Sequence, residues 1–382
     1  MTMAANAYTL QVGNWNFRIT PIRLVLLALT LGFGLLAVYR LIAGLGATTN
    51  MNDRWAWAYW LILDYVFIAL AGAGYSMALM SHVLHLNDVH RMSRRGMLIS
   101  LLFYVYALVI LGLEIGRWDN WYRPLFYWGY RSPLFEVYIA IMFYFGIQLV
   151  EFSEVATEKV FKSANRYVQL LLPTAFVLGA IIPFGHQGAL GAIFLAMPHK
   201  LHPLWYSSMI PWFYVLTSFY AGLSLLILEM FWSNRLYGSG IDTPALHKLL
   251  RIGACLMAAY FVWKLADLYR LNGLGYVFAG GFESIMFLLE LGGGVLLPVL
   301  IGLSRWGKTT AGLVAFAVLA TLGLILNRVN VLYTGFYQTF GPGYTPSLME
   351  WGVSIGLFAA IILAYLFIVE NFNIFRTEKA QC

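Results

Sequence analysis

The sequence predicts an all-α polytopic membrane protein with about ten transmembrane helices. Of its 382 residues, 61% are hydrophobic and only 11% are charged, whereas soluble domains carry about 25% charged residues. Its apolar stretches approach the roughly 20 residues that a helix needs to cross the hydrocarbon core, and they lack the short alternating pattern of barrel strands. This composition argues against a cytosolic enzyme, a disordered regulator and a nucleic-acid-binding protein.

Ten stretches have the length and composition of a membrane span. They are residues 22–45, 57–84, 97–114, 134–152, 167–185, 210–232, 249–267, 284–303, 309–331 and 347–369. We expect residues 22–369 to form a single integral membrane domain, in which helices at about 57–185 and 210–331 build two pseudo-related four-helix bundles with flanking helices. Residues 1–21 are expected to form a short polar N-terminal arm, and residues 370–382 a tail.

The distribution of Lys and Arg predicts the orientation of the chain. With ten spans, fifteen of the 24 basic residues fall on the side that holds both termini, and eight fall on the other side. Cytoplasmic loops carry an excess of basic residues. We therefore expect the N-terminal arm and the C-terminal tail to be cytoplasmic.

Two segments between the spans have unusual compositions. Residues 117–131 (RWDNWYRPLFYWGYR) mix aromatic residues with arginines, as a plain membrane-surface loop or a docking platform for a soluble or peripheral partner would. Residues 187–198 are apolar but too short to cross, and Gly188, Gly191 and Pro198 interrupt them. Non-helical backbone at membrane depth must be covered by protein or line a cavity, so we expect a re-entrant or lid-like segment here.

Several ionisable side chains lie within the apolar spans or at their mouths, where each costs about 2.5–3.5 kcal/mol to insert. They are Asp64, Glu114, Glu136, Glu229, Lys264, Asp267, Glu290 and His186. At a rise of about 1.5 Å per residue, Asp64, Glu114, Glu136 and His186 converge on the outer half of spans two to five. Burial favours the protonated form of an unpaired carboxyl group, which is the form that a proton carrier needs.

Simple pairing is an alternative explanation for some of these groups. Glu114 and Arg117 are three residues apart, as are Lys264 and Asp267, and such neighbours can pair on one helix. Asp64 of span two and Glu136 of span four have no basic residue three or four positions away. Pairing along one helix is therefore a weaker explanation for these two residues.

The residue types favour a quinone site over a metal or haem site. Two cysteines, Cys255 and Cys382, cannot supply the four thiolates that an iron–sulfur cluster usually takes. A haem b would need an axial pair, but His82 and His85 end span two at the face opposite His186. A quinone needs an apolar slot and a few polar groups for its ring oxygens, which the outer carboxylates and His186 would supply.

Several strings carry a resemblance to a known family. They are Glu114-Ile-Gly-Arg117-Trp118, Leu134-Phe135-Glu136, His186-Gln187, His202-Pro203-Leu204-Trp205 and Phe278-Ala279-Gly280. In these strings the sequence resembles the NrfD/polysulfide-reductase family of membrane subunits, and most closely the HybB-type branch that serves a nickel–iron hydrogenase. The resemblance extends from about residue 23 to residue 364, and the string that begins at His202 is its most specific part. The sequence departs from the hydrogenase pattern at residues 197–199.

The resemblance implies a quinone-reactive subunit of the bacterial inner membrane that has no redox centre of its own. It implies electron exchange with a periplasmic four-cluster, ferredoxin-like iron–sulfur subunit, which serves a catalytic subunit: a hydrogenase, a molybdoenzyme or a multihaem cytochrome. Tyr104, Glu136, His186 and Glu229 match positions linked to quinone chemistry and proton transfer in the family. Arg94 matches a basic position at the cytoplasmic entrance.

Our leading hypothesis is oxidation or reduction of menaquinone or ubiquinone at an outer-face site, with no haem or metal in this chain. Glu136 and His186 would bind or protonate the head group, with Asp64 and Glu114 nearby. A proton transporter or ion transporter without a redox role is one alternative, and a haem b-containing membrane anchor is another. Membrane lipid surrounds the protein in every case.

The same hypothesis includes a route for protons from the cytoplasmic side. Arg94, Glu229 and Tyr104 would form this route and would feed the outer-face site. Proton transfer along it would make quinone turnover electrogenic.

Overall fold

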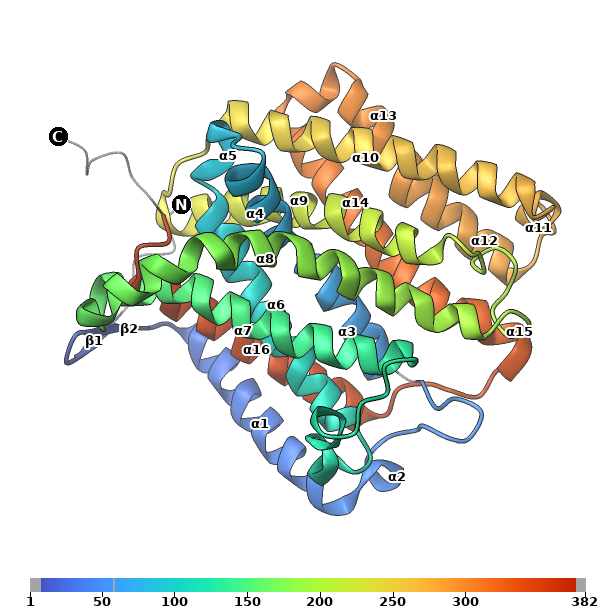
Figure 1. Cartoon of the computed structure of the whole chain (residues 1–382), viewed down its shortest axis with the longest axis horizontal. Helices are drawn as coiled ribbons and strands as arrows, with labels where there is room; N and C mark the ends of the chain where they lie inside the picture. Colours follow the sequence, from blue (N-terminus) through green and yellow to red (C-terminus); the bar gives the residue numbers. More distant parts are fainter. Residues whose placement is uncertain (1–7, 58, 376–382) are drawn as a thin grey trace.

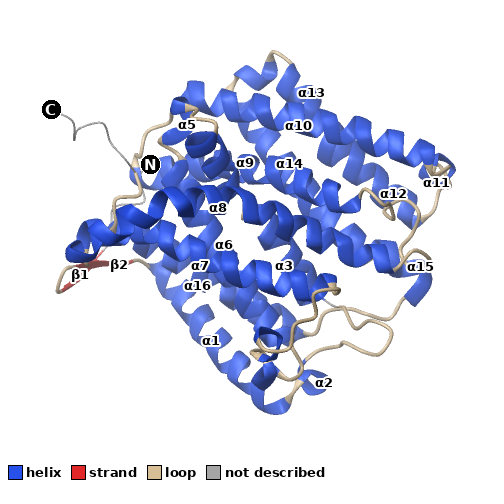
Figure 2. Cartoon of the chain, in the orientation of Figure 1, coloured by secondary structure: helices blue, strands red, loops and turns tan. Residues whose placement is uncertain are grey.

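The computed structural model describes residues 8–57 and 59–375, and helices dominate it (Figure 2). Within these ranges, ten helices are long and apolar enough to cross a membrane. The prediction of an all-α polytopic membrane protein with ten spans is confirmed.

The chain begins with a hairpin and one flanking span. Strands β1 (Tyr8–Val12) and β2 (Trp15–Ile19) pair antiparallel, and Gly13 turns the chain between them at a φ of +57°. Asn371 holds the hairpin against the last helix by two 2.9 Å hydrogen bonds with the Asn16 backbone. The expected polar arm is thus an ordered hairpin over residues 8–19, while residues 1–7 of the arm and 376–382 of the tail lie outside the described residues.

The flanking span α1 (Pro21–Ala43) starts on the Thr20 cap, and the short helix α2 (Leu45–Thr48) follows it. Helix α1 packs along α16 (Leu348–Asn371), which a Ser347–Glu350 capping box begins. Helix α16 in turn packs against α6. These two helices therefore flank the rest of the protein (Figure 1).

The first bundle consists of spans two to five. Span two is α3 (Tyr59–Leu70), α4 (Gly72–Ala78) and a π-helical turn η1 (Leu79–Val83), and the short α5 (Asn87–His90) follows. Spans three to five are α6 (Ser93–Glu114), α7 (Pro133–Lys159) and α8 (Asn165–Ala192). Helix α6 packs on α3 and α4, and α7 packs along α8. The 3-10 turns η2 (Trp118–Asn120) and η3 (Arg123–Leu125) connect α6 to α7, and η4 (Lys162–Ala164) connects α7 to α8.

The prediction of a re-entrant or lid-like segment at residues 187–198 is wrong. Helix α8 continues to Ala192, and one 3-10 turn, η5 (Ile193–Ala196), completes it. Pro183 is tolerated within this helix, because neighbouring protein can satisfy the backbone group that a proline leaves unpaired. His186 consequently lies inside a long helix and not at a helix end.

The second bundle consists of spans six to nine. These are α9 (Ile210–Tyr237), α10 (Thr243–Arg270), the composite span α12 (Phe282–Leu288), η6 (Leu289–Leu296) and α13 (Leu297–Leu303), and α14 (Thr310–Leu332). Short helical pieces connect or extend them: α11 (Leu274–Val277), η7 (Trp306–Lys308), η8 (Thr334–Phe336) and α15 (Tyr337–Phe340).

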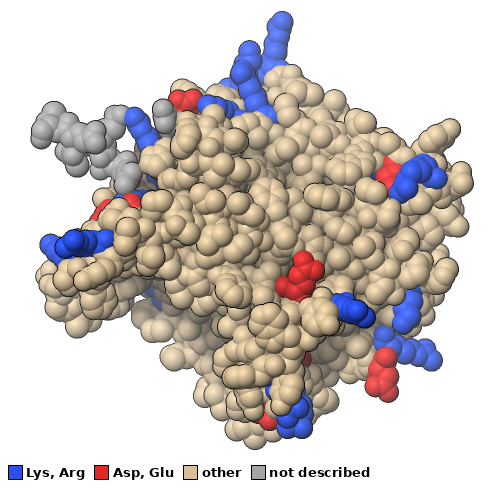
Figure 3. All heavy atoms as spheres, in the orientation of Figure 1, with Lys and Arg blue, Asp and Glu red and all other residues tan. Residues whose placement is uncertain are grey.

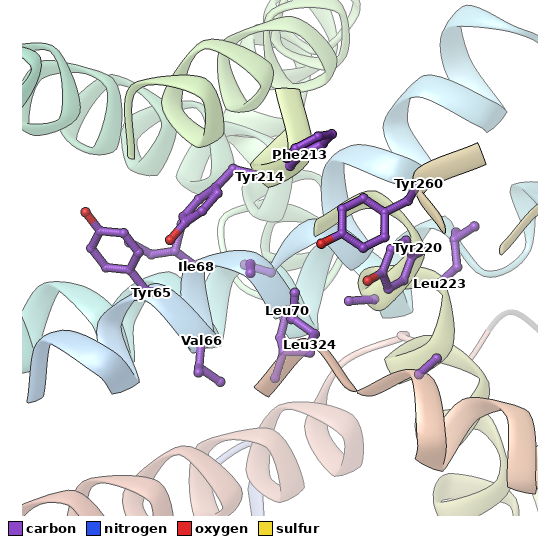
Figure 4. Close-up of a cluster of buried hydrophobic side chains, with 14 of the residues drawn as sticks. Tyr65, Val66, Ile68, Leu70, Phe213, Tyr214, Tyr220, Leu223, Tyr260 and Leu324 are labelled. Carbon is purple, nitrogen blue, oxygen red and sulfur yellow. The ribbon is translucent and has the colours of Figure 1, made fainter. Parts of the chain in front are cut away.

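The two bundles meet along α9. A Cβ added to Gly222 of α9 would overlap the backbone of Gly72 and Ala73 of α4, so glycine allows these two helices to approach closely. Side chains of α3, α9, α10 and α14 form a buried cluster beside this contact (Figure 4). The interface is therefore continuous core.

The elements at the helix ends define two sides of the molecule. We call the side with the β1–β2 hairpin and α5 the terminal side, because the hairpin that begins the described residues and the end of α16 lie there (Figure 1). We call the side with α2, residues 115–132, α11 and α15 the distal side. Charged side chains lie mainly around the rim of the face in Figure 3, and its broad middle is mostly uncharged.

Candidate functional site: two cavities and a polar connection

A cavity of about 570 Å³ opens on the distal side between the helices of the first bundle. Its walls combine apolar side chains with a few acidic and hydroxyl groups. They are Met51, Ala56, Trp57, Leu61, Asp64, Tyr65, Leu111, Glu114, Ile115, Pro124, Tyr127, Gly129, Ser132, Leu134, Phe135, Val137, Tyr138, Ile141, Leu190 and Ile193. We call it the distal cavity, and its size is typical of a small-molecule site.

Two predicted site residues, Asp64 and Glu114, line this cavity. Asp64 of α3 is 2% exposed, and its Oδ1 atom accepts no hydrogen bond within the described residues. Glu114 is the last residue of α6, and its Oε2 atom is likewise buried and unpartnered there. The expected alternative of a Glu114–Arg117 pair does not form, because α6 ends at Glu114 and Arg117 pairs with Asp119 at 3.1 Å. Unpaired buried acceptors are costly, so these two carboxyl groups are suited to an incoming donor.

Tyr104 and His186 form a buried pair on the terminal side of the distal cavity. The Tyr104 hydroxyl lies 2.9 Å from His186 Nδ1, and both side chains are fully buried. His186 Nε2 has no hydrogen-bond partner among the described residues. The pair can relay a proton in either direction, because each partner can both donate and accept one.

A second cavity, of about 480 Å³, opens on the terminal side of the same bundle. We call it the terminal cavity. Its walls come from α4, η1 and α5 to α8: Gly74, Ala78, His82, His90, Ser93, Arg94, Met97, Glu151, Glu154, Gln169, Leu172, Pro173, Phe176 and Val177.

The Tyr104–His186 pair lies between the two cavities. On α6, Met97 lines the terminal cavity and Leu111 lines the distal cavity, so Tyr104 is about 10 Å along the helix from each. On α8, Val177 lines the terminal cavity and Leu190 the distal cavity, with His186 between them. Along these two helices, Arg94 thus lines the terminal cavity, Glu114 lines the distal cavity, and Tyr104 and His186 lie between the two.

The structure does not bring Glu136 into this cluster. Glu136 is exposed, so the expectation of a buried carboxyl group at this position is wrong. Glu136 lies in the first turn of α7, next to the buried Val137. Phe143, seven residues further along the helix, is 64% exposed. A heptad spacing places Glu136 on the same outward face as Phe143. Its neighbours Phe135 and Val137 nevertheless line the distal cavity.

Arg94 and Glu229 are engaged in separate clusters on the terminal side. Arg94 lines the terminal cavity and binds Glu154 at 3.0 Å and Glu158 at 2.5 Å. Glu229 pairs instead with Arg95 at 3.4 Å and accepts a hydrogen bond from Tyr365. Consecutive residues of a helix point in different directions, and this separates Glu229 from Arg94.

Most of the buried charges of the second bundle have partners within the protein, although Asp267 Oδ2 and Arg328 Nε are unpartnered among the described residues. Asp267 pairs with Arg270 at 2.9 Å, and Lys264 lies over the Phe213 ring at 5.3 Å. The expected mutual neutralisation of Lys264 and Asp267 is therefore replaced by a pair between Asp267 and Arg270. Glu290 of η6 accepts hydrogen bonds from Trp205, Asn327 and Asn330.

The His202-Pro203-Leu204-Trp205 string has a structural role that follows from its contacts. The His202 backbone N–H donates to Gly335 at 2.7 Å, and the Trp205 indole donates to Glu290 at 2.9 Å. His202 Nδ1 accepts the Leu204 N–H, and burial lowers the pKa of this imidazole below its ordinary value. The string connects the loop before α9 to η6 and η8.

Sequence reasoning missed three polar residues between the cavities: Tyr144, Gln148 and Glu151 of α7. All three are buried. Glu151, Glu154 and Glu158 recur at helical spacing and could have indicated an acidic face opposite Arg94. The structure groups no three His, Cys, Asp or Glu side chains into a metal site within the residues it describes.

Comparisons with known proteins place the chain in a family. The family described as polysulphide reductase, NrfD, matches residues 47–341. A protein of Nitratidesulfovibrio vulgaris without a specific name is 31% identical over 88% of this chain and 89% of the relative. The probable Ni/Fe-hydrogenase 2 b-type cytochrome subunit of Escherichia coli is 29% identical over 88% of each chain.

A third relative is the integral membrane subunit of menaquinone reductase from N. vulgaris, which is 25% identical over 87% of each chain. The relatives span nearly the same length as this chain, and the family match covers most of its spans. The chain therefore belongs to the NrfD family of polysulphide-reductase membrane proteins.

Proposed function

We propose that this chain is the quinone-reactive membrane subunit of a respiratory oxidoreductase complex, and that the distal cavity binds the quinone head group. The observation that carries the proposal is the pair of unpartnered carboxyl oxygens, on Asp64 and Glu114, in a largely apolar cavity of about 570 Å³. A quinone presents two ring oxygens, and its reduction to the quinol takes up two electrons and two protons. A protonated carboxyl group can both bind such an oxygen and protonate it.

Different residues of the chain would bind the quinone and transfer protons to it. Trp57, Leu61 and Ile141 would enclose the apolar ring. Asp64 and Glu114 would orient the ring. The Tyr104–His186 pair would reprotonate these two carboxyl groups from the terminal side. Glu136, exposed beside the cavity wall, would exchange protons on the distal side.

Proton supply from the terminal side is part of the proposal. Arg94 at the wall of the terminal cavity and the Glu229 cluster would hold the cytoplasmic entrance, and Tyr104 would receive the protons. Transfer from that side to a distal quinone would separate charge across the membrane.

Electrons would come from, or leave to, a partner on the distal side. We propose a periplasmic four-cluster, ferredoxin-like iron–sulfur subunit that serves a hydrogenase, a molybdoenzyme or a multihaem cytochrome. The exposed Trp118, Trp121 and Trp128 in residues 115–132 would contribute to its docking surface beside the distal cavity. In this proposal both termini would lie in the cytoplasm, and the protein would lie in a bacterial inner membrane.

Removing the two cavity carboxyl groups tests this function. The complex would be purified through a tag on this chain and reconstituted into vesicles with a short-chain naphthoquinone and a chemically reduced viologen. Asp64→Asn and Glu114→Gln should each lower quinol formation by on the order of 100-fold, the usual contribution of a general acid.

The matched control is Asp53→Asn, which removes an exposed distal carboxyl group outside the cavity and should leave the rate unchanged. Co-purification of the partner subunits in all variants would show that assembly is intact. Rates equal to wild type in both cavity variants would contradict the quinone site. A reduced-minus-oxidised visible spectrum of the same samples tests the alternative of a haem-containing anchor.

A further inference from the structure

Glu151 is a buried carboxylate to which the proposed function assigns no role. Its side chain is 5% exposed and lines the terminal cavity. Its Oε1 atom accepts no hydrogen bond within the described ranges, and no ion pair reaches it there, because Arg94 binds Glu154 and Glu158 instead. An isolated buried acid in a membrane domain is costly and indicates a function.

Gly179 of α8 determines where the Glu151 carboxyl group lies. A Cβ added to Gly179 would overlap Glu151 Oε1. The carboxyl group therefore fits between α7 and α8 only because residue 179 has no side chain. This close packing directs the carboxyl group at the wall of the cavity.

Polar side chains continue from Glu151 towards the Tyr104–His186 pair. Gln148, one turn along α7, donates to Ser100 of α6, whose hydroxyl lies 3.4 Å from the Tyr144 hydroxyl. The Tyr144 ring contacts the Tyr104 ring with centroids 4.7 Å apart.

The terminal cavity itself extends to this polar chain. Gly74 lines the cavity, and a Cβ added to Gly74 would lie 2.6 Å from the Ser100 hydroxyl. Gln148 Oε1 is buried and unpartnered among the described residues. Water can join polar atoms over such short gaps when the site offers it several partners.

The other charged and titratable groups around Glu151 come from three sides of the cavity: His82 and His90 near α5, Arg94 of α6, and Tyr144 and Glu154 of α7. The residues of α8 that line the cavity, which are Gln169, Leu172, Pro173, Phe176 and Val177, include no such group. The acids nearer the surface bind Arg94. Glu151 is thus the innermost acidic group of the terminal cavity.

We infer that Glu151 takes up protons from the terminal cavity and passes them through Ser100 and Tyr144 to the Tyr104–His186 pair. This inference deepens the proposed function and rests on it, since the quinone consumes these protons. Each reduced quinone forms two O–H bonds with two protons from this route, and its two electrons come from the iron–sulfur partner. Oxidation of the quinol returns both protons along the same residues.

Two variants test this route in the reconstituted complex. Glu151→Gln keeps the shape of the side chain but cannot carry a proton, and Gly179→Ala keeps the acid but displaces it. Glu151→Gln should lower quinol formation by on the order of 100-fold without changing the KM for the naphthoquinone. Gly179→Ala should give a smaller loss of the same kind. A pH dye on the terminal side should report loss of proton uptake in both variants.

Glu158→Gln is the matched control, because it removes an acid two turns further along the same helix that is more exposed and binds Arg94. It should keep wild-type proton uptake. Wild-type turnover and proton uptake in Glu151→Gln would overturn the inference, and so would an equal loss in Glu158→Gln.

A quinone-independent measurement separates this inference from the proposed function. If the wild-type complex does not reduce the naphthoquinone, the proposed function fails. Infrared difference spectra after a pH step on the terminal side would then decide the inference. A protonated-carboxyl band that disappears in Glu151→Gln would support it, and an unchanged band would overturn it.

Discussion

Asp64 in the first bundle and Glu290 in the second are equally buried but have opposite surroundings. Asp64 is 2% exposed and Glu290 is 1% exposed. Glu290 accepts hydrogen bonds from Trp205, Asn327 and Asn330 at 2.9, 2.6 and 2.7 Å. Asp64 lines a cavity with one oxygen unpartnered among the described residues. Burial alone therefore does not distinguish a structural carboxyl group from a reactive one, whereas its hydrogen-bond partners do.

The same contrast extends to the groups around each acid. In the second bundle, Arg328 donates to Thr217 at 3.0 Å and lies 3.8 Å from the centre of the Tyr214 ring, while its Nε has no partner among the described residues. In the first bundle, His186 has one free nitrogen within the described residues. The satisfied network around Glu290 favours a rigid, unique packing, whereas Asp64, Glu114 and His186 each keep a polar atom without a partner among the described residues.

The largest effect on stability is expected from Glu290→Ala. The substitution leaves three buried donors without an acceptor, and at about 0.6–1.7 kcal/mol per hydrogen bond in a membrane protein the free energy of unfolding should fall by about 2–5 kcal/mol. Thermal unfolding in mixed micelles measures this change. Asp64→Asn, examined in the same way, should leave the unfolding midpoint nearly unchanged, and equal destabilisation by both variants would remove the distinction between the two acids.

A smaller effect is expected from Glu136→Gln. Because Glu136 is exposed and does not line the distal cavity, its replacement should lower quinol formation by only about twofold, far less than the roughly 100-fold expected for a general acid. The reconstituted quinone assay measures this ratio beside Asp64→Asn. A loss as large as that of Asp64→Asn would show that Glu136 turns into the distal cavity in the assembled complex.

The smallest effect concerns the pH dependence of stability through His202. Burial lowers the pKa of this imidazole in the folded protein, so the unfolded chain binds its proton more readily. The contribution of His202 to stability is therefore present at neutral pH and decreases as the pH falls below about 6.5. Its slope should remain below the roughly 1.4 kcal/mol per pH unit of one full proton.

Comparing unfolding of the wild type with that of His202→Gln between pH 5 and pH 7, roughly the range in which histidine titrates, isolates this contribution. The difference between the two proteins should shrink as the pH falls. A difference that grows at acidic pH would contradict the assigned sign.

The ten spans could be predicted because each depends on the length and composition of its own segment. The π-helical turns, by contrast, could not be predicted, and neither could the continuation of α8 through Pro183 to Ala192. The continuation of α8 depends on neighbouring protein that covers the backbone group which Pro183 leaves unpaired. The hairpin over residues 8–19 also depends on a distant contact, between Asn16 and Asn371.

The candidate site was predicted in part for a related reason. Depth along a helix follows from residue number, so Asp64 and Glu114 could be placed at one end of the bundle from the sequence. His186 was expected at a helix end and lies inside α8, outside the lining of the distal cavity. Direction around the helix depends on packing, and this is why Glu136 was expected inside and lies outside. Glu151 was missed because its acidic segment resembles a solvated helix end.

The most direct test of the central claim is the position of a bound quinone. A photoreactive azidoquinone would be crosslinked to the reconstituted wild-type complex and the labelled peptides identified by mass spectrometry. We predict labelling of the distal-cavity segments around Tyr65 of α3 and Tyr138 of α7, suppressed by excess naphthoquinone. Labelling confined to the terminal cavity around Gln169, or spread along the outward face of α1 without competition, would contradict the account.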